Sequence, residues 1–233
     1  MIKMQKIKTR NWDGNKITAL HMIKDRYEID SNNIDFVVKA LEAKSLNKRF
    51  HDEPKKIVNE MIRKCHGSMG MYSSSRAGCL YYEDGAYELK KDVSVEHTVP
   101  VANLIDLYIQ GNDYRNIGKK HSFGFVLFFP VCLLSKTSNS KLKLSAKNNN
   151  NIRFPFRRYL EAGIEGPIFD CTGNKIDLFE YTIKDHFDLV LDIANTDKPY
   201  FSNELAEILN HFNVSSEIDG FLSAYGFEVS VAA

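Results

Sequence analysis

The chain has 233 residues, 43% hydrophobic and 26% charged, a composition typical of a soluble globular protein with one large domain or two small ones. Its 31 basic and 30 acidic residues leave a net charge of +1, so any nucleic-acid-binding surface must be a local patch. No apolar run reaches the ~18 residues that cross a bilayer, and residues 1–10 are basic without the apolar segment of a secretion signal. Four widely spaced cysteines without a C-x-x-C pair argue against structural zinc and indicate reduced thiols. We therefore expect a cytoplasmic protein that makes no membrane contact.

Residues 1–75 are predicted to form a helical N-terminal region. Apolar side chains recur at helical spacing over residues 16–28, and Ser31 is expected to cap a second helix over 34–41. Pro54 lies where the first turn of a third helix is expected, a position that tolerates proline because its missing N–H has no helical partner there. Three amphipathic helices are enough for a small bundle or for a helical cap on a sheet.

Residues 76–162 are predicted to mix strands and helices. Two short strands, 80–82 and 87–89, flank a turn, and a third strand is expected over 93–97. The stretch 100–110 is predicted as a helix that begins with a proline and ends at a glycine. This region is the expected core of the protein.

The core region continues with a basic loop, a strand and a helix. We expect a polar loop over 112–122, followed by a buried strand over 123–134 that Pro130 interrupts or ends. A helix is predicted to begin near 135–139 and to fade into the polar low-complexity segment 147–151.

Residues 163–233 are predicted to pack as a separate C-terminal region. A small hairpin is expected around the turn at 173–174, followed by helices over 183–194 and 203–212 that each begin after a capping residue. A terminal strand is expected over 227–231. The chain as a whole is therefore predicted to be an α+β protein.

Three side chains carry the chemistry that the sequence indicates. Hydrolysis of a phosphodiester needs a group that deprotonates water, and the imidazole of His97 suits that task. It also needs a positive charge on the phosphate and the leaving oxygen, which a Mg²⁺ ion held by the oxygens of Glu96 and Asn139 would supply. Neighbouring residues of a strand point to opposite faces, so Glu96 and His97 can share a site only at a strand end or bulge, such as one caused by Pro100.

The segments E-H-T-V-P and V-C-L-L-S-K-T-S-N-S-K, within residues 87–159, resemble the HNH nuclease motif, or ββα-metal finger. The resemblance implies two strands followed by a helix, one Mg²⁺ or Mn²⁺ per active site, and cleavage of DNA. It makes Glu96 and Asn139 the metal ligands, His97 the general base, and Lys141 a residue near the phosphate. The fold it implies is α+β with a central ββα-metal element between helical N-terminal and mixed C-terminal regions.

The family also has a polar residue near the second strand that orients the base. Here the corresponding stretch, 128–130, is Phe-Phe-Pro and offers none, so His121 or Asn116 would have to take that role. Four further basic residues are expected either to contact DNA phosphates or to lie on a solvated charged surface. These residues are Lys119, Lys120, Arg157 and Arg158.

Each of the three central residues also has a purely structural interpretation. His97 is equally compatible with a partly buried structural histidine, and Glu96 with a salt-bridge partner on a strand edge. Asn139 is a residue type favoured at helix starts for its own capping ability.

The function that we predict is a metal-dependent endonuclease that cleaves double-stranded DNA. The additional helical material at both ends favours a sequence-specific, restriction-type enzyme that acts as a homodimer. A homing, phage or defence-system nuclease or nickase is the alternative within the family. A noncatalytic nucleic-acid-binding module on the same scaffold is the alternative outside enzymes.

Overall fold

The computed structural model describes most of the chain, in ten stretches separated by short gaps. These are residues 10–12, 15–17, 19–42, 52–72, 78–89, 91–114, 119–145, 152–164, 166–196 and 202–224. The strands are β1 (Arg10–Trp12), β2 (Asn15–Ile17), β3 (Tyr81–Glu83), β4 (Val93–His97), β5 (Val131–Ser135) and β6 (Ile168–Asp170). The helices are α1 (Ala19–Glu42), α2 (Glu53–Ser68), α3 (Val101–Tyr114), α4 (Lys119–Leu127), α5 (Lys136–Ser145), α6 (Arg157–Glu161), α7 (Ile183–Asn195), α8 (Ser202–His211) and α9 (Val214–Ala224).

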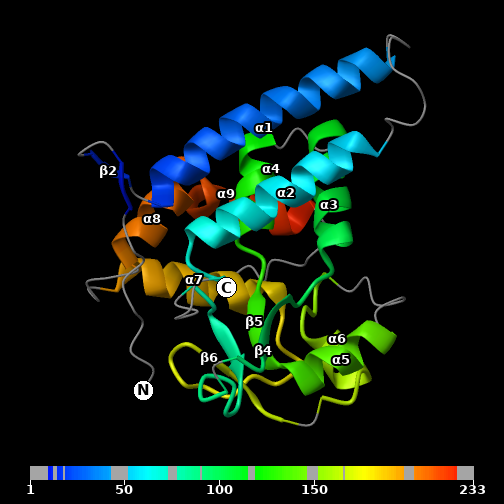
Figure 1. Ribbon diagram of the computed structural model, residues 1–233, viewed down its shortest axis with the longest axis vertical. Coiled ribbons are helices and arrows are strands. Elements are labelled where there is room, and N and C mark those ends of the chain that lie inside the picture. Colours follow the sequence, from blue (N-terminus) through cyan, green and yellow to red (C-terminus); the bar gives the residue numbers. More distant parts are fainter. Residues whose placement is uncertain are drawn as a thin grey trace.

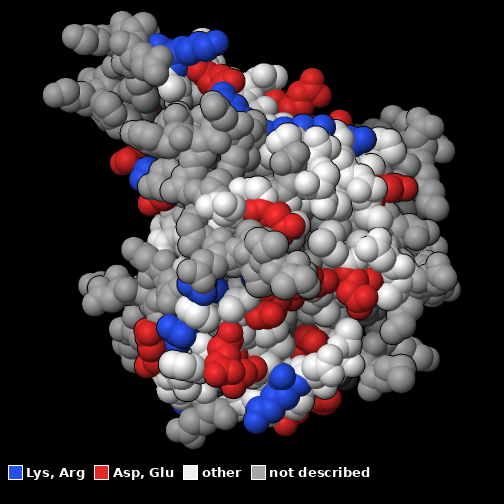
Figure 2. All heavy atoms as spheres, turned by 180° about the vertical axis from the view of Figure 1, so that it is seen from behind, with Lys and Arg blue, Asp and Glu red and all other residues white. Residues whose placement is uncertain are grey.

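Most of the helices lie at one end of the molecule and the larger sheet at the other, which confirms the predicted α+β class. Figure 1 shows α1, α2, α3, α4, α8 and α9 gathered at one end, and the strands β4, β5 and β6 with α5 and α6 at the other. Helix α7 crosses between the two groups. On the face shown in Figure 2, the described acidic and basic side chains are interspersed, and no broad area of Lys and Arg alone is seen.

The larger sheet has the strand order β4-β5-β3-β6. Strand β4 is an edge strand, paired antiparallel with β5, while β3 runs parallel to β5 and antiparallel to β6. Helix α5 begins directly after β5 and contacts both β4 and β5. Two antiparallel strands and a helix therefore follow one another in space, with α3 and α4 inserted in the chain between the strands.

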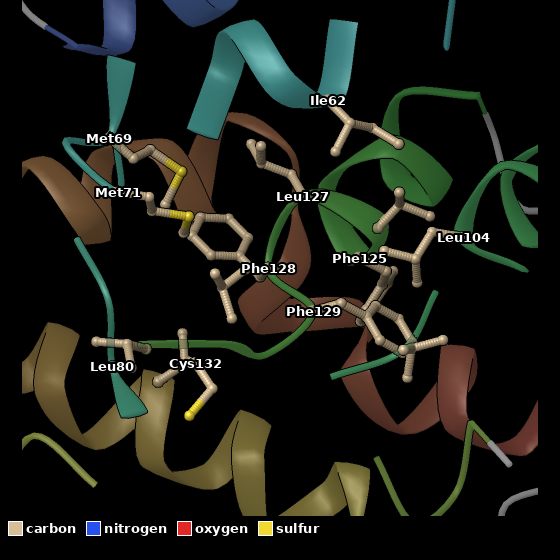
Figure 3. Close-up of a cluster of buried hydrophobic side chains, with 14 of the residues drawn as sticks. Ile62, Met69, Met71, Leu80, Leu104, Phe125, Leu127, Phe128, Phe129 and Cys132 are labelled. Atoms are coloured by element: carbon tan, nitrogen blue, oxygen red, sulfur yellow. The ribbon is translucent and has the colours of Figure 1, made fainter. Parts of the chain in front are cut away.

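The hydrophobic core is continuous from the helices to the sheet. Buried residues from all three predicted regions of the chain belong to one cluster. Figure 3 shows how α2, the segment after it, α4 and β5 meet in this cluster. The residues labelled there are Ile62, Met69, Met71, Leu80, Leu104, Phe125, Leu127, Phe128, Phe129 and Cys132.

Helix α1 is one continuous helix, so the predicted break at Ser31 is wrong. The Ser31 hydroxyl donates to the Glu28 carbonyl within the helix, at 3.2 Å, and does not cap a new one. The buried residues Ile23 and Ile34 lie on the same face before and after Ser31. One buried face runs along the helix and outweighs the local preference of serine for caps.

The apolar run 123–134 was predicted as a strand that Pro130 interrupts or ends; the part after Pro130 is the strand β5, but the part before it is the end of α4. Residues 112–122, predicted as a loop, likewise include the end of α3 and the start of α4. Every residue from Ser122 to Leu127 is buried, so α4 shows no polar face that would have revealed a helical period. The predicted strand at 87–89 is also wrong, because residues 84–89 form turns and β3 pairs instead with β5 and β6.

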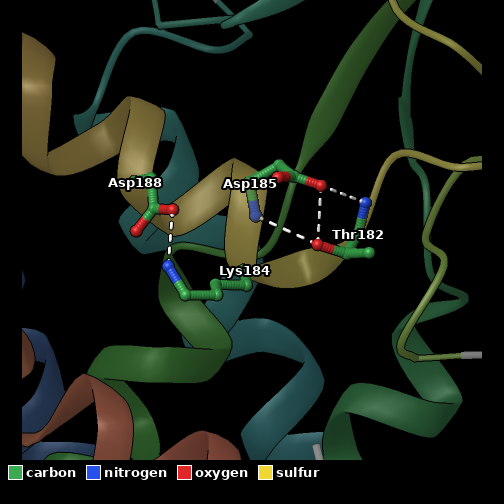
Figure 4. A network of polar contacts seen from close by, with 4 residues as sticks. All are labelled: Thr182, Lys184, Asp185 and Asp188. Atoms are coloured by element: carbon green, nitrogen blue, oxygen red, sulfur yellow. Dashed lines mark hydrogen bonds and ion pairs between the residues drawn. The ribbon is translucent and has the colours of Figure 1, made fainter. Parts of the chain in front are cut away.

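Several other described elements agree with the sequence predictions, whereas β1, β2, α6 and α9 were not predicted and α3 continues past the expected stop at Gly111. Helix α2 has Pro54 in its first turn, and α3 and α5 begin where they were expected. The turn after β6 returns the chain, with Phe169 bridged to Lys175. Helix α7 begins at a capping box in which the Asp185 amide donates to the Thr182 hydroxyl oxygen at 3.2 Å and the Thr182 amide donates to Asp185 Oδ2 at 2.7 Å (Figure 4). The segments 147–151 and 227–231 lie outside the described residues.

Candidate functional site

Strand β4 presents Glu96 and His97 at the edge of the sheet. The strand pairs with β5 one residue to one residue from Val93 to His97, without a bulge. Successive side chains of a regular strand alternate between the two faces, so Glu96 and His97 start from opposite faces of β4. The bulge that would bring both side chains into one site is not present in this strand. Because β4 is an edge strand, both faces nevertheless border the same open edge.

Glu96 forms an ion pair with Arg158 of the short helix α6. Arg158 donates from Nη2 to Glu96 Oε1 at 2.8 Å, with the Arg158 side chain 8% exposed and that of Glu96 29%. The second donor of the guanidinium, Arg158 Nε, is buried without a hydrogen-bond partner. A buried guanidinium is costly unless a carboxylate pairs with it. In this structure Glu96 is therefore a salt-bridge partner, the structural interpretation that the sequence offered for a glutamate on a strand edge.

His97 contacts a second histidine, His66 of α2. Nε2 of His97 lies 3.0 Å from Nδ1 of His66, and the two rings stack with centroids 5.0 Å apart. Nε2 of His66 lies 2.8 Å from the carbonyl oxygen of Leu127, the last residue of α4. His66 is fully buried, whereas His97 keeps 7% of its surface exposed. Of the two, only His97 has any exposed surface.

The hydrogen bonds determine which nitrogen of each ring carries the proton. A carbonyl oxygen only accepts, so His66 donates to Leu127 from Nε2. Burial lowers the pKa of His66 to about 4, so at neutral pH this ring carries one proton and its Nδ1 is an acceptor. His97 must then donate from Nε2 to His66. Its own Nδ1 keeps a free lone pair, and no described residue hydrogen-bonds to it.

The surroundings also keep His97 neutral. Burial lowers the pKa of His97 well below its usual value of 6.5, and the nearby His66, Arg63 and Arg158 lower it further. A neutral imidazole with an unpartnered nitrogen is the form that accepts a proton. His97 therefore meets the first requirement of a general base over the whole neutral range.

Asn139 lies in the first turn of α5 and is half-buried. The start of this helix is fixed to β3 by Glu83, which accepts from the Ser135 amide at 2.7 Å and from the Ser138 hydroxyl. No hydrogen bond of the Asn139 side chain is found within the described part of the chain. Its position at a helix start agrees with either interpretation made from the sequence.

The described side chains do not form a ready metal site. No group of three or more His, Cys, Asp or Glu side chains that could hold a metal ion is found among them. The carboxylate of Glu96, the expected first ligand, is engaged by Arg158. In this arrangement Glu96 would have to release Arg158 before it could ligate a Mg²⁺ or Mn²⁺ ion.

Most of the basic residues expected at the DNA already have partners. Lys141 donates to the Gly163 carbonyl at 2.8 Å, and Lys119 pairs with Asp35 of α1. The Arg157 guanidinium lies 3.6 Å from the Phe154 ring centre and 4.4 Å from that of Phe179, and its Nε donates to the Phe179 carbonyl at 3.0 Å. Arg158 is buried against Glu96, and Lys120 is half-buried. The structure thus gathers Arg158 beside Glu96 and His97, and distributes the other basic residues elsewhere.

His121, one of the two residues expected to orient His97, does not lie beside it. His121 lies in the first turn of α4 and accepts from Asn213 Nδ2 at Nε2, at 2.8 Å, whereas His97 is linked through His66 to the opposite end of that helix. Asn116 lies outside the described residues. The orienting partner in the structure is His66, which the sequence showed only as a histidine next to Cys65.

Comparisons with known proteins add no identity. No protein-family model, no curated protein and no solved structure matches this chain. Among the described helices, none combines the length and the apolar character that crossing a membrane would require.

Proposed function

We propose that the protein is an endonuclease that hydrolyses phosphodiester bonds in double-stranded DNA, with His97 as its general base. The observation that carries this proposal is the hydrogen-bond chain from His97 through His66 to the Leu127 carbonyl. The chain fixes the proton on Nε2 of His97 and leaves Nδ1 as an acceptor, which is the arrangement that deprotonation of a water molecule requires.

The order of elements supports the same proposal. Strands β4 and β5 are antiparallel, and α5 follows β5 and contacts both strands. His97 ends the first strand and Asn139 lies in the first turn of the helix, the order that the resemblance to HNH nucleases implies.

The chain's own residues would act as follows. The oxygen of a water molecule attacks the phosphorus, its proton passes to Nδ1 of His97, and the bond from phosphorus to the departing 3′ oxygen breaks, that oxygen taking up a proton from solvent. The anionic phosphate beside His97 would raise the affinity of this imidazole for the proton, offsetting the low pKa of the free protein. Arg158, which now pairs with Glu96, would be released when that carboxylate binds the ion and would bring its positive charge to the phosphate.

Dependence on a divalent ion remains part of the proposal, with Glu96 and Asn139 as the oxygen ligands. Such an ion supplies charge neutralisation at the phosphate. Glu96 would first have to exchange Arg158 for the ion, so metal binding and the Glu96–Arg158 ion pair exclude each other. Sequence specificity and a restriction role remain predictions from the sequence.

A noncatalytic nucleic-acid-binding module is the second candidate. The observation in its favour is the ion pair between Glu96 and Arg158, which occupies the expected metal ligand. In this case the protein would bind duplex DNA without cleaving it under any condition.

The test is plasmid cleavage in Mg²⁺ or Mn²⁺ by four purified proteins of verified fold. Wild type is expected to nick or linearise the plasmid, and His97→Ala to lose about 10²- to 10⁴-fold in rate, the usual contribution of a general base. His66→Ala is expected to lose about tenfold, because the base remains but is no longer oriented. His21→Ala, which removes an exposed histidine on α1, is the matched control and is expected to cut like wild type.

Two outcomes would contradict the proposal. Equal cutting by wild type and His97→Ala would show that another residue is the base. If wild type binds labelled duplex DNA but cuts no sequence with any divalent ion, the noncatalytic candidate stands instead.

A further inference from the structure

The outward face of α1 carries two large apolar side chains that the described fold leaves uncovered. Phe36 is 70% exposed and Ile29 is 57% exposed. They are separated by two helical turns and therefore lie on one side of the helix. In Figure 1, α1 forms the outer edge of the molecule, with α2 along its inner side.

These two residues belong to a stripe that follows the spacing of a coiled-coil seam. Its members are separated alternately by four and three residues, and all are exposed. The stripe spans about 21 Å at 1.5 Å per residue and lies opposite the buried face of Ile23 and Ile34. The residues of this α1 stripe are Asp25, Ile29, Asn32, Phe36 and Lys39.

The α1 stripe is complementary to itself when reversed. Asp25 and Lys39 are placed symmetrically about Asn32, and so, within half a residue, are Ile29 and Phe36. Two antiparallel copies would therefore place each aspartate opposite a lysine and each isoleucine beside a phenylalanine. Neither Asp25 nor Lys39 has an ion-pair partner within the described residues.

We propose that the α1 stripe is the interface of an antiparallel homodimer, with two copies of α1 packed around a two-fold axis near Asn32. An isologous contact of this kind requires one patch that matches itself, which the order acid, apolar, amide, apolar, base provides. A polar asparagine at the centre of an apolar seam favours one register over shifted ones. The proposal is independent of catalysis by His97.

The dimer is expected to be weak. One helix pair of four turns buries less than the ~1,200 Å² of a stable interface, so the dimer population depends on protein concentration. Its charged pairs are at the ends of the contact and exposed, so they set orientation more than affinity.

The test is sedimentation velocity of the full chain across a wide concentration range. Wild type is expected to shift from monomer towards dimer as concentration rises, and Phe36→Asp to raise the dissociation constant at least about tenfold. Leu160→Asp, which changes an exposed apolar residue of α6 in the same way, is the matched control and is expected to behave like wild type. Circular dichroism verifies that each variant is folded.

Charge reversal tests the antiparallel orientation. Asp25→Lys places lysine opposite lysine in its own dimer, and Lys39→Asp places aspartate opposite aspartate, so each alone is expected to dimerise less than wild type. An equimolar mixture of the two restores both ion pairs in the heterodimer and is expected to recover dimerisation. A wild type that stays monomeric at every concentration, a dimer unaffected by Phe36→Asp, or a mixture no better than its components would each overturn the proposal.

Discussion

Two buried histidines, His66 and His186, contact carbonyl groups at the C-terminal end of α4, but they differ in the hydrogen-bond partner of their other ring nitrogen. His66 donates from Nε2 to the carbonyl of Leu127, and His186 of α7 contacts the next carbonyl, that of Phe128, with the same atom. The last carbonyls of a helix have no hydrogen-bond partners inside the helix. Each histidine therefore hydrogen-bonds a carbonyl that would otherwise be buried without a partner. Burial lowers the pKa of both rings to about 4.

The difference lies at Nδ1. Nδ1 of His186 accepts from the hydroxyl of Tyr81 at 2.7 Å, and Tyr81 in turn accepts from Tyr181 at 2.9 Å, so this chain ends in side chains without acid–base chemistry at neutral pH. Nδ1 of His66 accepts from His97, whose own Nδ1 remains an acceptor. The comparison separates a histidine linked only to tyrosines from one linked to the proposed base, although both look alike in the sequence.

Among the tests of this comparison, His186→Ala is expected to lower the free energy of unfolding most. The substitution leaves the Phe128 carbonyl buried without its partner, leaves the Tyr81 hydroxyl with Tyr181 alone, and opens a cavity, so the free energy of unfolding should fall by about 4 kcal/mol. His97→Ala leaves one buried acceptor, Nδ1 of His66, without its donor and should cost about 2 kcal/mol. Urea unfolding measures both, and equal losses would mean that His97 is as structural as His186.

Acid is expected to act on both histidines alike. Because the pKa of His66 and of His186 is lowered from 6.5 to about 4, the folded state binds fewer protons than the unfolded state between these values. The stability present above pH ~6.5 is therefore lost as pH falls towards 4, by about 3 kcal/mol for each ring.

Urea unfolding of wild type and His186→Gln across this pH range measures that contribution. Glutamine can still donate to the Phe128 carbonyl but does not titrate there, so the variant should lose less stability on acidification than wild type. Identical pH dependence of the two proteins would contradict a lowered pKa for His186.

A smaller effect is expected from a substitution in α4, whose C-terminal end places both carbonyls. A Cβ atom added at Gly124 of α4 would lie 2.5 Å from Phe212 Cβ, closer than the packing allows. Gly124→Ala should therefore lower the free energy of unfolding by about 2 kcal/mol, despite the better helix propensity of alanine. Gly67→Ala in α2, where the added Cβ meets only Tyr72 at 3.9 Å, is the control, and a stabilised Gly124→Ala would contradict this packing.

The smallest effect is expected at the start of α7, which positions His186. Thr182→Ala removes one half of the capping box and should cost about 1 kcal/mol. Thr137→Ala, an exposed threonine inside the first turn of α5, should change the stability by much less. Both are measured by urea unfolding, and equal changes would show that the capping box is not stabilising.

Elements with a local signal could be predicted from the sequence, whereas the polar links between them could not. Strand β4 and helix α7 were expected, because a short apolar stretch and a capping threonine can each be recognised from a few neighbouring residues. Helix α4 was missed because it is buried on every side and shows no helical period. The link from His97 to His66 crosses 31 residues of sequence and arises from tertiary packing of α2 on the end of β4.

The same limit applies to the candidate site. The sequence selected Glu96 and His97, and it offered a salt bridge as the structural interpretation of Glu96, which is what the structure contains. Its partner Arg158 was assigned to DNA because 62 residues separate the two in the chain. We expected Glu96 and His97 to share a face only if a bulge or strand end turns the chain, but the sequence could not show whether a bulge exists. The structure shows a regular strand, which places the two side chains on opposite faces.

The most direct test of the account is the tautomer of His97. Two-bond ¹H–¹⁵N correlation spectra of ¹⁵N-histidine-labelled protein distinguish a protonated ring nitrogen from an unprotonated one. We expect Nε2 of both His97 and His66 to carry the proton at neutral pH, and Nδ1 of His97 to remain unprotonated to well below pH 6.5. A His97 that carries its proton on Nδ1, or that titrates near 6.5, would contradict the claim that His66 holds it as a neutral base.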